Sequence, residues 1–286
     1  MKALIMAGGF GTRLRPLTTH VPKPMVPMGN VPIMEHTVRL LRRHGFTDLQ
    51  ALLYFLPETI TGYFGDGSRF GVTLDYVTPT ADLGTAGAVK FALGSPAEPI
   101  LVISGDVLTD FDLAAAVAFH RERRAEATMV LTRVQHPLPY GIVITGEAGR
   151  ITRFLEKPGW GEVFSDTVNT GIYILEPSVF DAIPPHREYD FGKDLFPALL
   201  AEGRPLYGHV AERSRDGRCG QIRARQPGGA HPGHLGRRAH RFRSGGSGRL
   251  SPGASGRGHH GAHPRPASAP VRHCDHRRGG PDHPLP

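Results

Sequence analysis

The sequence predicts an α/β fold, a Rossmann-like and mostly parallel sheet sandwiched by helices, with a disordered C-terminal tail. The first observation is that short apolar runs, typical of buried parallel strands, alternate with helical segments up to about residue 134. This rhythm favours a parallel sheet with helices on both faces. The second observation is a sharp change of composition after residue 211. We therefore expect a folded domain over residues 1–211 and a low-complexity basic tail over residues 212–286.

The elements of the first part follow from apolar periodicity and from end signals. A buried strand over residues 3–6 leads into a glycine-rich loop. Pro32 begins a helix with an apolar face, and Gly45 closes it. The other strands of this part are predicted at residues 49–55, 72–77, 99–104 and 128–134, and the other helices at 58–64, 83–91 and 113–124.

From Tyr140 the rhythm changes, because strands follow one another with only turns between them. We expect an inserted, more antiparallel portion here. Its strands are predicted at residues 140–145, 151–155 and 168–175, followed by short helices at 177–182 and 191–201 and a last strand at 206–211.

Charge is distributed unevenly along the 286 residues. Up to Ala211 there are 19 Lys and Arg against 22 Asp and Glu, a net charge of −3, whereas the remainder has 15 against 4, a net charge of +11. The basicity therefore belongs to the tail, and no nucleic-acid partner is predicted from it. The tail also has few large apolar residues, so it is expected to be disordered.

Both cysteines, Cys219 and Cys274, lie in the tail, so the domain has no disulfide framework. Zinc binding by the cysteines and histidines of the tail is not predicted. The N-terminus has the pattern of neither a signal peptide nor a membrane span. We expect a cytoplasmic protein with no membrane partner.

The most informative stretch is the loop after the first strand, which has three glycines within four residues, Gly8, Gly9 and Gly11. Glycine lets a backbone approach a ligand closely, so that its N–H groups can converge on phosphate oxygens. Arg13 and Lys23 add positive charge, and a guanidinium can bind a phosphate through two hydrogen bonds. A plain tight turn is the alternative, since the loop is neither G-x-G-x-x-G nor a P-loop. The combination predicts a polyphosphate site.

Asp106 follows an apolar strand, at the position where ligands bind in open α/β sheets. A carboxylate there suits Mg²⁺, which takes oxygen ligands and shares them with substrate phosphates. The alternative is an aspartate that merely caps the next helix. Asp110 or Asp112 fits that capping role better, which leaves Asp106 for the metal.

Three further segments carry groups suited to ligands. Glu156 and Lys157 follow another strand, where a lysine can hold a phosphate and a carboxylate can bind sugar hydroxyls, although such a pair is also common in solvated turns. Asn169 and Gly171 interrupt an apolar strand, and a glycine there often marks a bulge or a close ligand approach. Residues 83–87 offer backbone groups and a helix N-terminus, suited to a base edge or an anion.

The pattern G-G-x-G-T-R-L-x-P-L-T, followed by P-K-P, resembles the signature of the sugar-phosphate nucleotidyltransferases, or NDP-sugar pyrophosphorylases. The later segments match that family in its order, and the resemblance covers residues 1–211. It implies the nucleotide-diphospho-sugar transferase type of fold. It also implies that the nucleotide is bound by Gly8, Gly9, Gly11, Thr12, Gly84 and Thr85, and the sugar 1-phosphate by Gly141, Glu156, Lys157, Asn169 and Gly171.

The resemblance further implies catalytic roles for Arg13 and Lys23 on the phosphates and for Asp106 as the ligand of Mg²⁺. The partners would be a nucleoside triphosphate and a sugar 1-phosphate. An oxygen of the sugar phosphate, already an anion, would attack the α-phosphorus and release pyrophosphate. No general base is required, so catalysis would rest on positioning and on neutralising charge.

The substrates are less constrained by the sequence. Residues 83–87, 156–160 and 164–167 resemble the bacterial mannose-1-phosphate guanylyltransferases, which make GDP-mannose from GTP. A glucose-1-phosphate uridylyl- or thymidylyltransferase is the alternative. A third hypothesis is a regulatory paralogue that binds nucleotide-sugars without making them. A homo-oligomer is left open.

The chain departs from this family after residue 211. The family's Glu-Gly-Tyr-Trp-x-Asp-Val-Gly, whose Asp completes the metal site, is missing, and Asp216 is at most its remnant. The Arg-, Gly-, Pro- and His-rich sequence that follows is typical of the translation of a GC-rich gene in the wrong reading frame. We therefore hypothesise a reading-frame shift near Glu212, with a natural basic tail as the alternative.

Overall fold

A computed structural model describes residues 1–9 and 11–211 of the chain. Phe10 lies outside the described residues, as does the whole segment 212–286. The predictions made for that segment, its disorder and the frame shift among them, therefore find no test in this structure. No helix within the described part is both long and apolar enough to cross a membrane.

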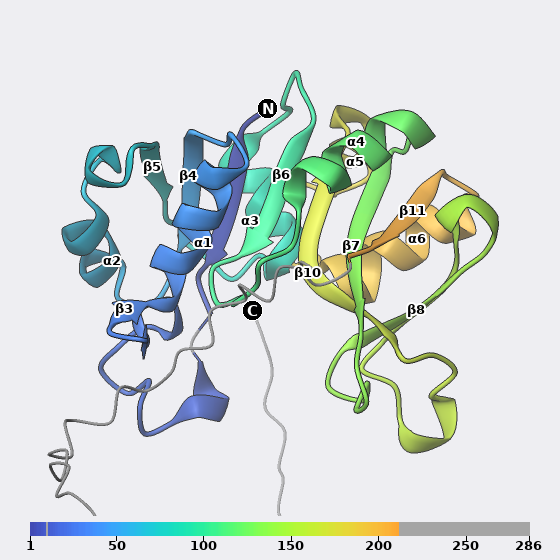
Figure 1. Cartoon of the computed structure of the whole chain (residues 1–286), viewed down its shortest axis with the longest axis horizontal. Coiled ribbons are helices and arrows are strands. Elements are labelled where there is room, and N and C mark those ends of the chain that lie inside the picture. Colours follow the sequence, from blue (N-terminus) through green and yellow to red (C-terminus); the bar gives the residue numbers. More distant parts are fainter. Residues whose placement is uncertain (10, 212–286) are drawn as a thin grey trace, which may run out of the picture. The chain divides into compact units, whose positions relative to one another are not determined.

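The described residues form one mixed sheet covered by helices (Figure 1). Its main path has the order β11-β7-β10-β6-β1-β4-β5. Four strands at one end are mutually parallel, as predicted: β1 (Ala3–Ala7), β4 (Asp48–Leu53), β5 (Thr73–Val77) and β6 (Ile100–Ser104). The mostly parallel α/β fold predicted from the sequence is confirmed.

The other end of the sheet contains β7 (Ala127–Arg133), β10 (Thr167–Leu175) and β11 (Leu206–Val210). β10 lies between β6 and β7 and is antiparallel to both, whereas β11 is parallel to β7. An antiparallel hairpin of β8 (Gly141–Thr145) and β9 (Ile151–Glu156) joins through β10. The expected antiparallel portion is thus not a separate insertion, because its longest strand is built into the main sheet.

Helices cover both faces of the sheet (Figure 1). Their bounds lie within one or two residues of the predicted ones for α1 (Ile33–Arg43), α2 (Pro57–Phe64), α3 (Gly84–Leu93), α4 (Leu113–Arg123) and α5 (Pro177–Asp181). A short hairpin of β2 (Pro27–Met28) and β3 (Val31–Pro32) and several single 3₁₀ turns were not predicted.

The single helix predicted over residues 191–201 is wrong in one respect. It is divided into a π-helical turn, η6 (Phe191–Leu195), and α6 (Phe196–Ala201). The N–H of Leu195 donates to the carbonyl of Asp190, five residues back. Pro197 explains the wide turn, because a proline ring clashes with the carbonyl four residues earlier and has no N–H to donate.

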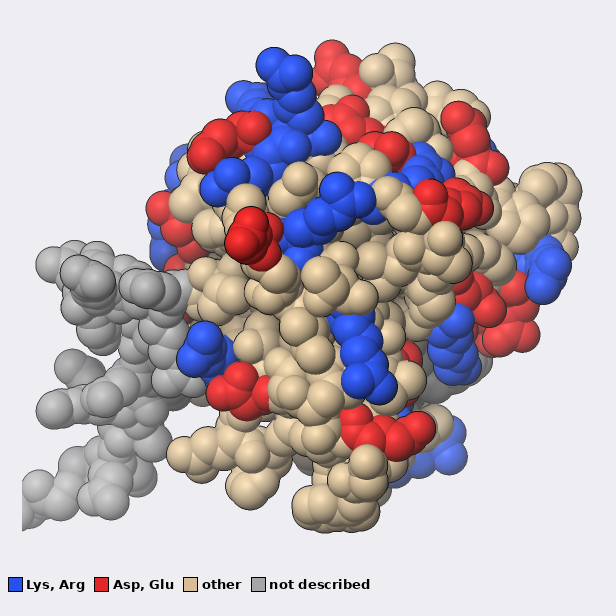
Figure 2. All heavy atoms as spheres, turned by 90° about the vertical axis from the view of Figure 1, so that its right-hand side faces the viewer, with Lys and Arg blue, Asp and Glu red and all other residues tan. Residues whose placement is uncertain are grey.

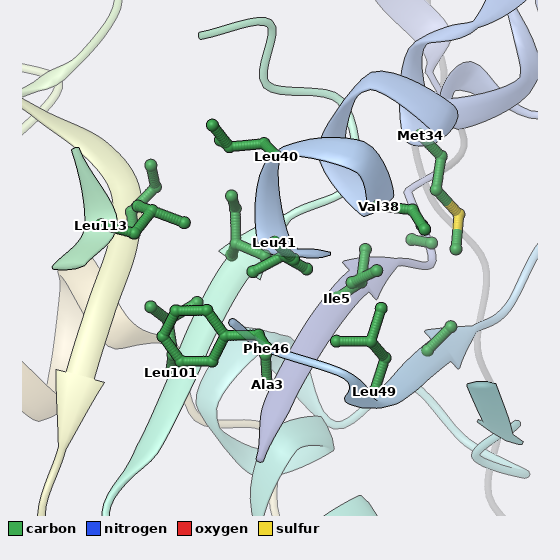
Figure 3. Packing of buried hydrophobic residues seen from close by; sticks show 14 of the residues in the cluster. Ala3, Ile5, Met34, Val38, Leu40, Leu41, Phe46, Leu49, Leu101 and Leu113 are labelled. Carbon is green, nitrogen blue, oxygen red and sulfur yellow. The ribbon is translucent and has the colours of Figure 1, made fainter. Parts of the chain in front are cut away.

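Two cores lie on opposite faces of the sheet, because successive strand residues point to opposite sides. Ile5 of β1 belongs to one core and Leu4 to the other. In the first core Val38 and Leu41 of α1 pack over β1 and its neighbours (Figure 3). Burial on both faces explains why these strands are continuous apolar runs rather than alternating ones.

Candidate active site

The glycine loop lies at the carboxyl end of β1 and requires glycine at two of its positions. A Cβ on Gly8 would lie 3.1 Å from Cβ of Tyr54. Gly11 has a φ of 61°, and a Cβ there would lie 2.9 Å from Cγ2 of Thr18. The buried Thr18 hydroxyl donates to the Gly11 carbonyl over 2.7 Å, so it fixes the loop from behind. Thr18 is the last residue of the pattern G-G-x-G-T-R-L-x-P-L-T, but the sequence alone assigned no role to its side chain.

Lys23 and Asp106 form an ion pair, although 82 residues separate them in the sequence. Lys23 begins a 3₁₀ turn, η2 (Lys23–Met25), and Asp106 follows β6 by two residues. About a third of each side chain remains exposed, 35% for the lysine and 30% for the aspartate. The two residues predicted separately as phosphate and metal ligands are therefore brought together, with opposite charges in contact.

Beside this pair is a cavity of about 400 Å³, here called the larger cavity. Gly8 and Gly9 line it together with the Lys23–Asp106 pair. Other residues that line it are Tyr54, Pro79, Ala81, Asp82, Leu83, Gly84, Thr85 and Glu188. A glycine loop and an ammonium group thus line the same hollow, a combination suited to an anion.

Two predicted nucleotide ligands lie beside the larger cavity rather than on its wall. Among the described residues that line it, Gly11 and Thr12 are absent. Thr12 is exposed in the 3₁₀ turn η1 (Thr12–Leu14). The backbone of Arg13 belongs to the same turn, but its side chain lies outside the described part of the structure. The phosphate-bridging role of Arg13 stays a prediction.

The N-terminus of α3 was predicted to offer free N–H groups to a base or an anion, but two of these groups are already bonded within the domain. The N–H groups of Ala86 and Gly87 both donate to the carbonyl of Tyr189, over 2.8 and 2.9 Å. Gly84 has a φ of 66°, and a Cβ there would lie 2.8 Å from the same carbonyl oxygen. A segment from the far end of the domain therefore occupies this helix terminus. Gly84 and Thr85 still line the larger cavity.

A second hollow of about 220 Å³, the smaller cavity, adjoins the larger one. Glu156 and Lys157 line it, and the Lys157 ammonium lies 3.5 Å from the Glu156 carboxylate. A Cβ on either Gly141 or Gly192 would lie 2.6 Å from Oε2 of Glu156. Both glycines therefore leave room for this carboxylate. Gly141, predicted to bind the sugar phosphate, lines neither cavity itself, and its role stays a prediction.

Asn169 and Gly171 form a bulge in β10, as the glycine in the strand predicted. The pairing of β10 with β7 shifts register between Asn169 and Tyr173. The Asn169 side chain accepts from the Gly171 N–H over 2.9 Å and donates to the Tyr173 hydroxyl over 2.8 Å. Full burial raises the pKa of that hydroxyl well above its ordinary value. Asn169 lines the smaller cavity, but its amide is also used to hold the bulge.

The two cavities share part of their walls, formed by Met6, Thr85, Ser104 and Asp190. Sequence reasoning missed Asp190. Its carboxylate accepts from the Thr85 hydroxyl over 2.9 Å, and the Phe191 N–H donates to that hydroxyl over 3.0 Å. The run of charges around a glycine at residues 188–193 is a weak signal for this site. Only the fold shows that the run docks on a helix about a hundred residues earlier.

No group of three or more His, Cys, Asp or Glu side chains within residues 1–9 and 11–211 is placed to hold a metal ion. Asp106 is the predicted ligand, and Lys23 is its partner in this structure. Magnesium often takes one or two carboxylates and completes its shell with water and substrate phosphates. The described residues therefore fit such an ion only in part, through one carboxylate.

On the face shown in Figure 2, lysines and arginines alternate with acidic residues. No single-sign patch covers that face of the described part. This agrees with the small net charge counted for residues 1–211.

Comparison with known proteins identifies the family. Residues 2–219 match the family described as Nucleotidyl transferase, and the chain belongs to it. It is 43% identical over 222 residues to a UTP–glucose-1-phosphate uridylyltransferase from Synechocystis sp., covering 72% of this chain and 57% of that protein. It is 39% identical over 210 residues to a mannose-1-phosphate guanylyltransferase from Mycobacterium tuberculosis, covering 73% of this chain and 58% of that one.

A solved structure agrees with the assignment. It is a Bacillus anthracis protein with a provisional assignment as a glucose-1-phosphate thymidylyltransferase, in complex with a sucrose. The TM-score is 0.66 at 25% identity, over 74% of this chain and 88% of that one. The chain covers 57% of the length of the uridylyltransferase and 58% of the length of the guanylyltransferase, so it spans little more than half of each relative.

Proposed function

We propose that this chain transfers a nucleotidyl group from a nucleoside triphosphate to a sugar 1-phosphate and releases pyrophosphate. The observation that carries the proposal is the pair of adjoining cavities, each lined by lysine side chains. Lys23 lines the larger cavity beside the glycine loop, and Lys157 and Lys193 line the smaller one. Two phosphate-bearing substrates bound there would meet at the shared wall, where Asp190 lies.

The proposed reaction requires the protein mainly to position the two substrates and to neutralise their negative charge. The attacking oxygen belongs to a phosphate and is already anionic, so no side chain has to remove a proton from it. Lys157 would hold the sugar phosphate, and Lys23 would neutralise charge that develops on the nucleotide phosphates. Asp106 would hold Mg²⁺, which, when bound, supplies further charge neutralisation to the phosphates. Lys23 would then leave its pairing with Asp106 and turn toward the nucleotide.

GTP and mannose 1-phosphate are the substrates that we favour. The guanylyltransferase relative from Mycobacterium tuberculosis supports this choice. Asp82 and Glu188 support it too, since both line the larger cavity. Carboxylates accept hydrogen bonds, and the edge of guanine presents N–H donors to them. UTP or TTP with glucose 1-phosphate is the alternative, supported by the 43% identity to the uridylyltransferase.

Pyrophosphate release measured with each nucleotide and sugar phosphate, in the presence of Mg²⁺, tests the proposal. We expect turnover for GTP with mannose 1-phosphate above that for UTP or TTP with glucose 1-phosphate. The Lys23→Met variant should lose most of it. Lys2→Met is the matched control, because Lys2 pairs with Asp48 at the opposite edge of the sheet. Binding of nucleotide-sugar without turnover for any pair would instead establish the non-catalytic paralogue.

A further inference from the structure

The loop between β9 and β10 projects from the edge of the sheet where the substrates would bind. β10 is antiparallel to β6 and pairs with it through residues 172–175, so the earlier residues of β10 extend beyond the carboxyl end of β6. Figure 1 shows this loop on the same side of the sheet as the ends of β1 and β6. The loop also begins at Lys157, which lines the smaller cavity. Its first residue therefore lines the cavity proposed for the sugar phosphate, and the residues after it follow that cavity in sequence.

This loop has two fixed ends and an unsupported middle. At one end Pro158 is buried, and the Lys157 N–H donates to the Tyr140 carbonyl over 3.1 Å. At the other end the Arg153 guanidinium lies 4.0 Å from the ring centre of Phe164. The five residues between these ends, 159–163, are all exposed. We call them the flap.

The flap is held together by its own hydrogen bonds. The Gly159 N–H donates to the Glu162 carboxylate over 2.8 Å, and the Glu162 N–H donates to the Gly159 carbonyl over 3.0 Å. A Cβ on Gly161 would meet nothing within 4 Å. Lys157, at the base of the flap, has a left-handed φ of 45°. A small closed turn on a glycine-containing base can move as a unit.

Trp160 stands at the top of the flap with 87% of its surface exposed, the largest value among the exposed apolar residues of the described part. Tryptophan is highly buried in most folded proteins, and its exposure here leaves a large apolar surface in water. Trp160 lines neither cavity in this arrangement, but it follows Lys157, which lines the smaller cavity, by three residues. An exposed aromatic residue so close in sequence to a polar cavity points to a ligand with an apolar face. Hexose rings have such a face, formed by their C–H groups.

We propose that the flap closes over the smaller cavity and that the Trp160 indole packs on the ring of the bound sugar 1-phosphate. This inference rests on the proposed function, because it assigns the sugar to the smaller cavity. It explains why the flap carries an aromatic residue between two glycines. Trp160 would then determine affinity for the sugar ring and would exclude water from the reacting phosphates, without taking part in the chemistry.

Trp160 is the single tryptophan of the chain, so its fluorescence reports the flap directly. The full chain would be titrated with mannose 1-phosphate, with glucose 1-phosphate and with inorganic phosphate. We expect the hexose phosphates, and not phosphate alone, to shift the emission to the blue and to protect the indole from acrylamide. A shift that follows protein concentration instead of ligand would mean that a second copy covers Trp160, and the proposal would be overturned.

Kinetics provide a second measurement. Trp160→Ala should raise KM for the sugar 1-phosphate about tenfold, the effect of losing a partly buried aromatic contact, and should leave KM for the nucleotide unchanged. Trp160→Tyr should restore most of the affinity. Phe91→Ala is the matched control, since Phe91 is an aromatic residue of α3 with 45% exposure. Equal KM values for Trp160→Ala and Phe91→Ala would contradict the proposal.

The two readouts separate this inference from the function on which it rests. Turnover with an unchanged emission spectrum at saturating sugar phosphate would overturn the flap and leave the nucleotidyltransferase assignment standing. An emission shift without turnover would support the flap and remove the enzymatic assignment. Absence of both turnover and the emission shift would overturn both the proposed function and the flap.

Discussion

The two halves of the sheet build their parts of the site in different ways. In the parallel half, β1 and β6 each end in a loop that lines the larger cavity, and the supporting contact between Thr18 and Gly11 spans only seven residues. In the mixed half, the smaller cavity needs β9, the bulge of β10 and residues 190–193 together. The bond from Asp190 to Thr85 that joins the halves spans 105 residues.

This difference shows which parts of a site can be predicted from local sequence patterns alone. A loop that follows a parallel strand lies at the carboxyl ends of the strands, where ligands bind, whichever strands are its neighbours. A glycine pattern or a single aspartate in such a loop can therefore be interpreted without knowing the strand order. A site lined by an antiparallel strand depends on which strand is inserted where. Here β10 enters between β6 and β7, which brings Asn169 to the same edge as Asp106. Four predictions test the contrast, from the largest expected effect to the smallest.

The first concerns the parallel half. Asp106→Asn should lower kcat/KM about a hundredfold at fixed Mg²⁺, because it weakens the binding of the ion proposed to neutralise the reacting phosphates, and one such charge contact is worth on the order of 3 kcal/mol. Additional Mg²⁺ should recover part of the loss. Asp112→Asn is the control, because Asp112 caps α4 by accepting from the Ala115 N–H. If both variants lose only thermal stability, Asp106 is a turn residue.

The second concerns the mixed half. Gly192→Ala should displace the Glu156 carboxylate, whose oxygen lies 2.6 Å from the position of the new Cβ. Because that oxygen is the end of a flexible side chain, stability should change little. KM for the sugar 1-phosphate should rise about tenfold, or roughly 1.4 kcal/mol, with KM for the nucleotide unchanged. Gly62→Ala is the control, because Gly62 likewise has no left-handed φ and a Cβ there would meet nothing within 4 Å. A rise in both KM values would argue against separate cavities.

The third tests the connection between the halves. A double-mutant cycle of Thr85→Val and Asp190→Asn, followed by chemical unfolding, should give a coupling energy of about 1 kcal/mol. Each single variant should also raise both KM values, because the two residues line both cavities. Thr61→Val removes a surface hydroxyl that bonds within its own helix, and should show no coupling to Asp190. Additive effects of the first pair would mean that the halves are held together elsewhere.

The smallest effect is a pH dependence of stability. His120 is buried against Thr128 and Glu176, and burial lowers its pKa although the Glu176 hydrogen bond opposes this. The unfolded chain therefore binds this proton more tightly, so the stability contribution is present above pH 6.5 and is lost as the pH falls below it. The slope for one proton cannot exceed about 1.4 kcal/mol per pH unit.

Measuring the free energy of unfolding between pH 5 and pH 8 checks this, with pH values chosen from the ordinary titration range of histidine, about 6.5. His120→Gln should flatten the curve, and His20→Gln, at an exposed position, should not. Part of the slope should remain, since burial also lowers the pKa values of His44 and His209. An unchanged curve for His120→Gln would show that the pKa of His120 is the same in the folded and unfolded states.

The sequence by itself determined the order and type of nearly every element, and it predicted a phosphate-binding loop. Each depends on interactions within a few residues, such as the apolar run of β1 and the glycines that follow it. Lys23, Asp106, Glu156 and Lys157 were predicted as site residues for the same reason, since each lies directly beside a strand end or a loop motif. The family was predicted from these sequence motifs and is confirmed by the match over residues 2–219.

Only the tertiary structure decided which of these residues meet. The pairing of Lys23 with Asp106, the docking of Tyr189 on the start of α3 and the place of Asp190 between two cavities have no local signature. The physical reason is that periodicity reports which face of an element is buried but not what it is buried against. The partner is chosen by strand order, and here the insertion of β10 into a parallel sheet makes that choice.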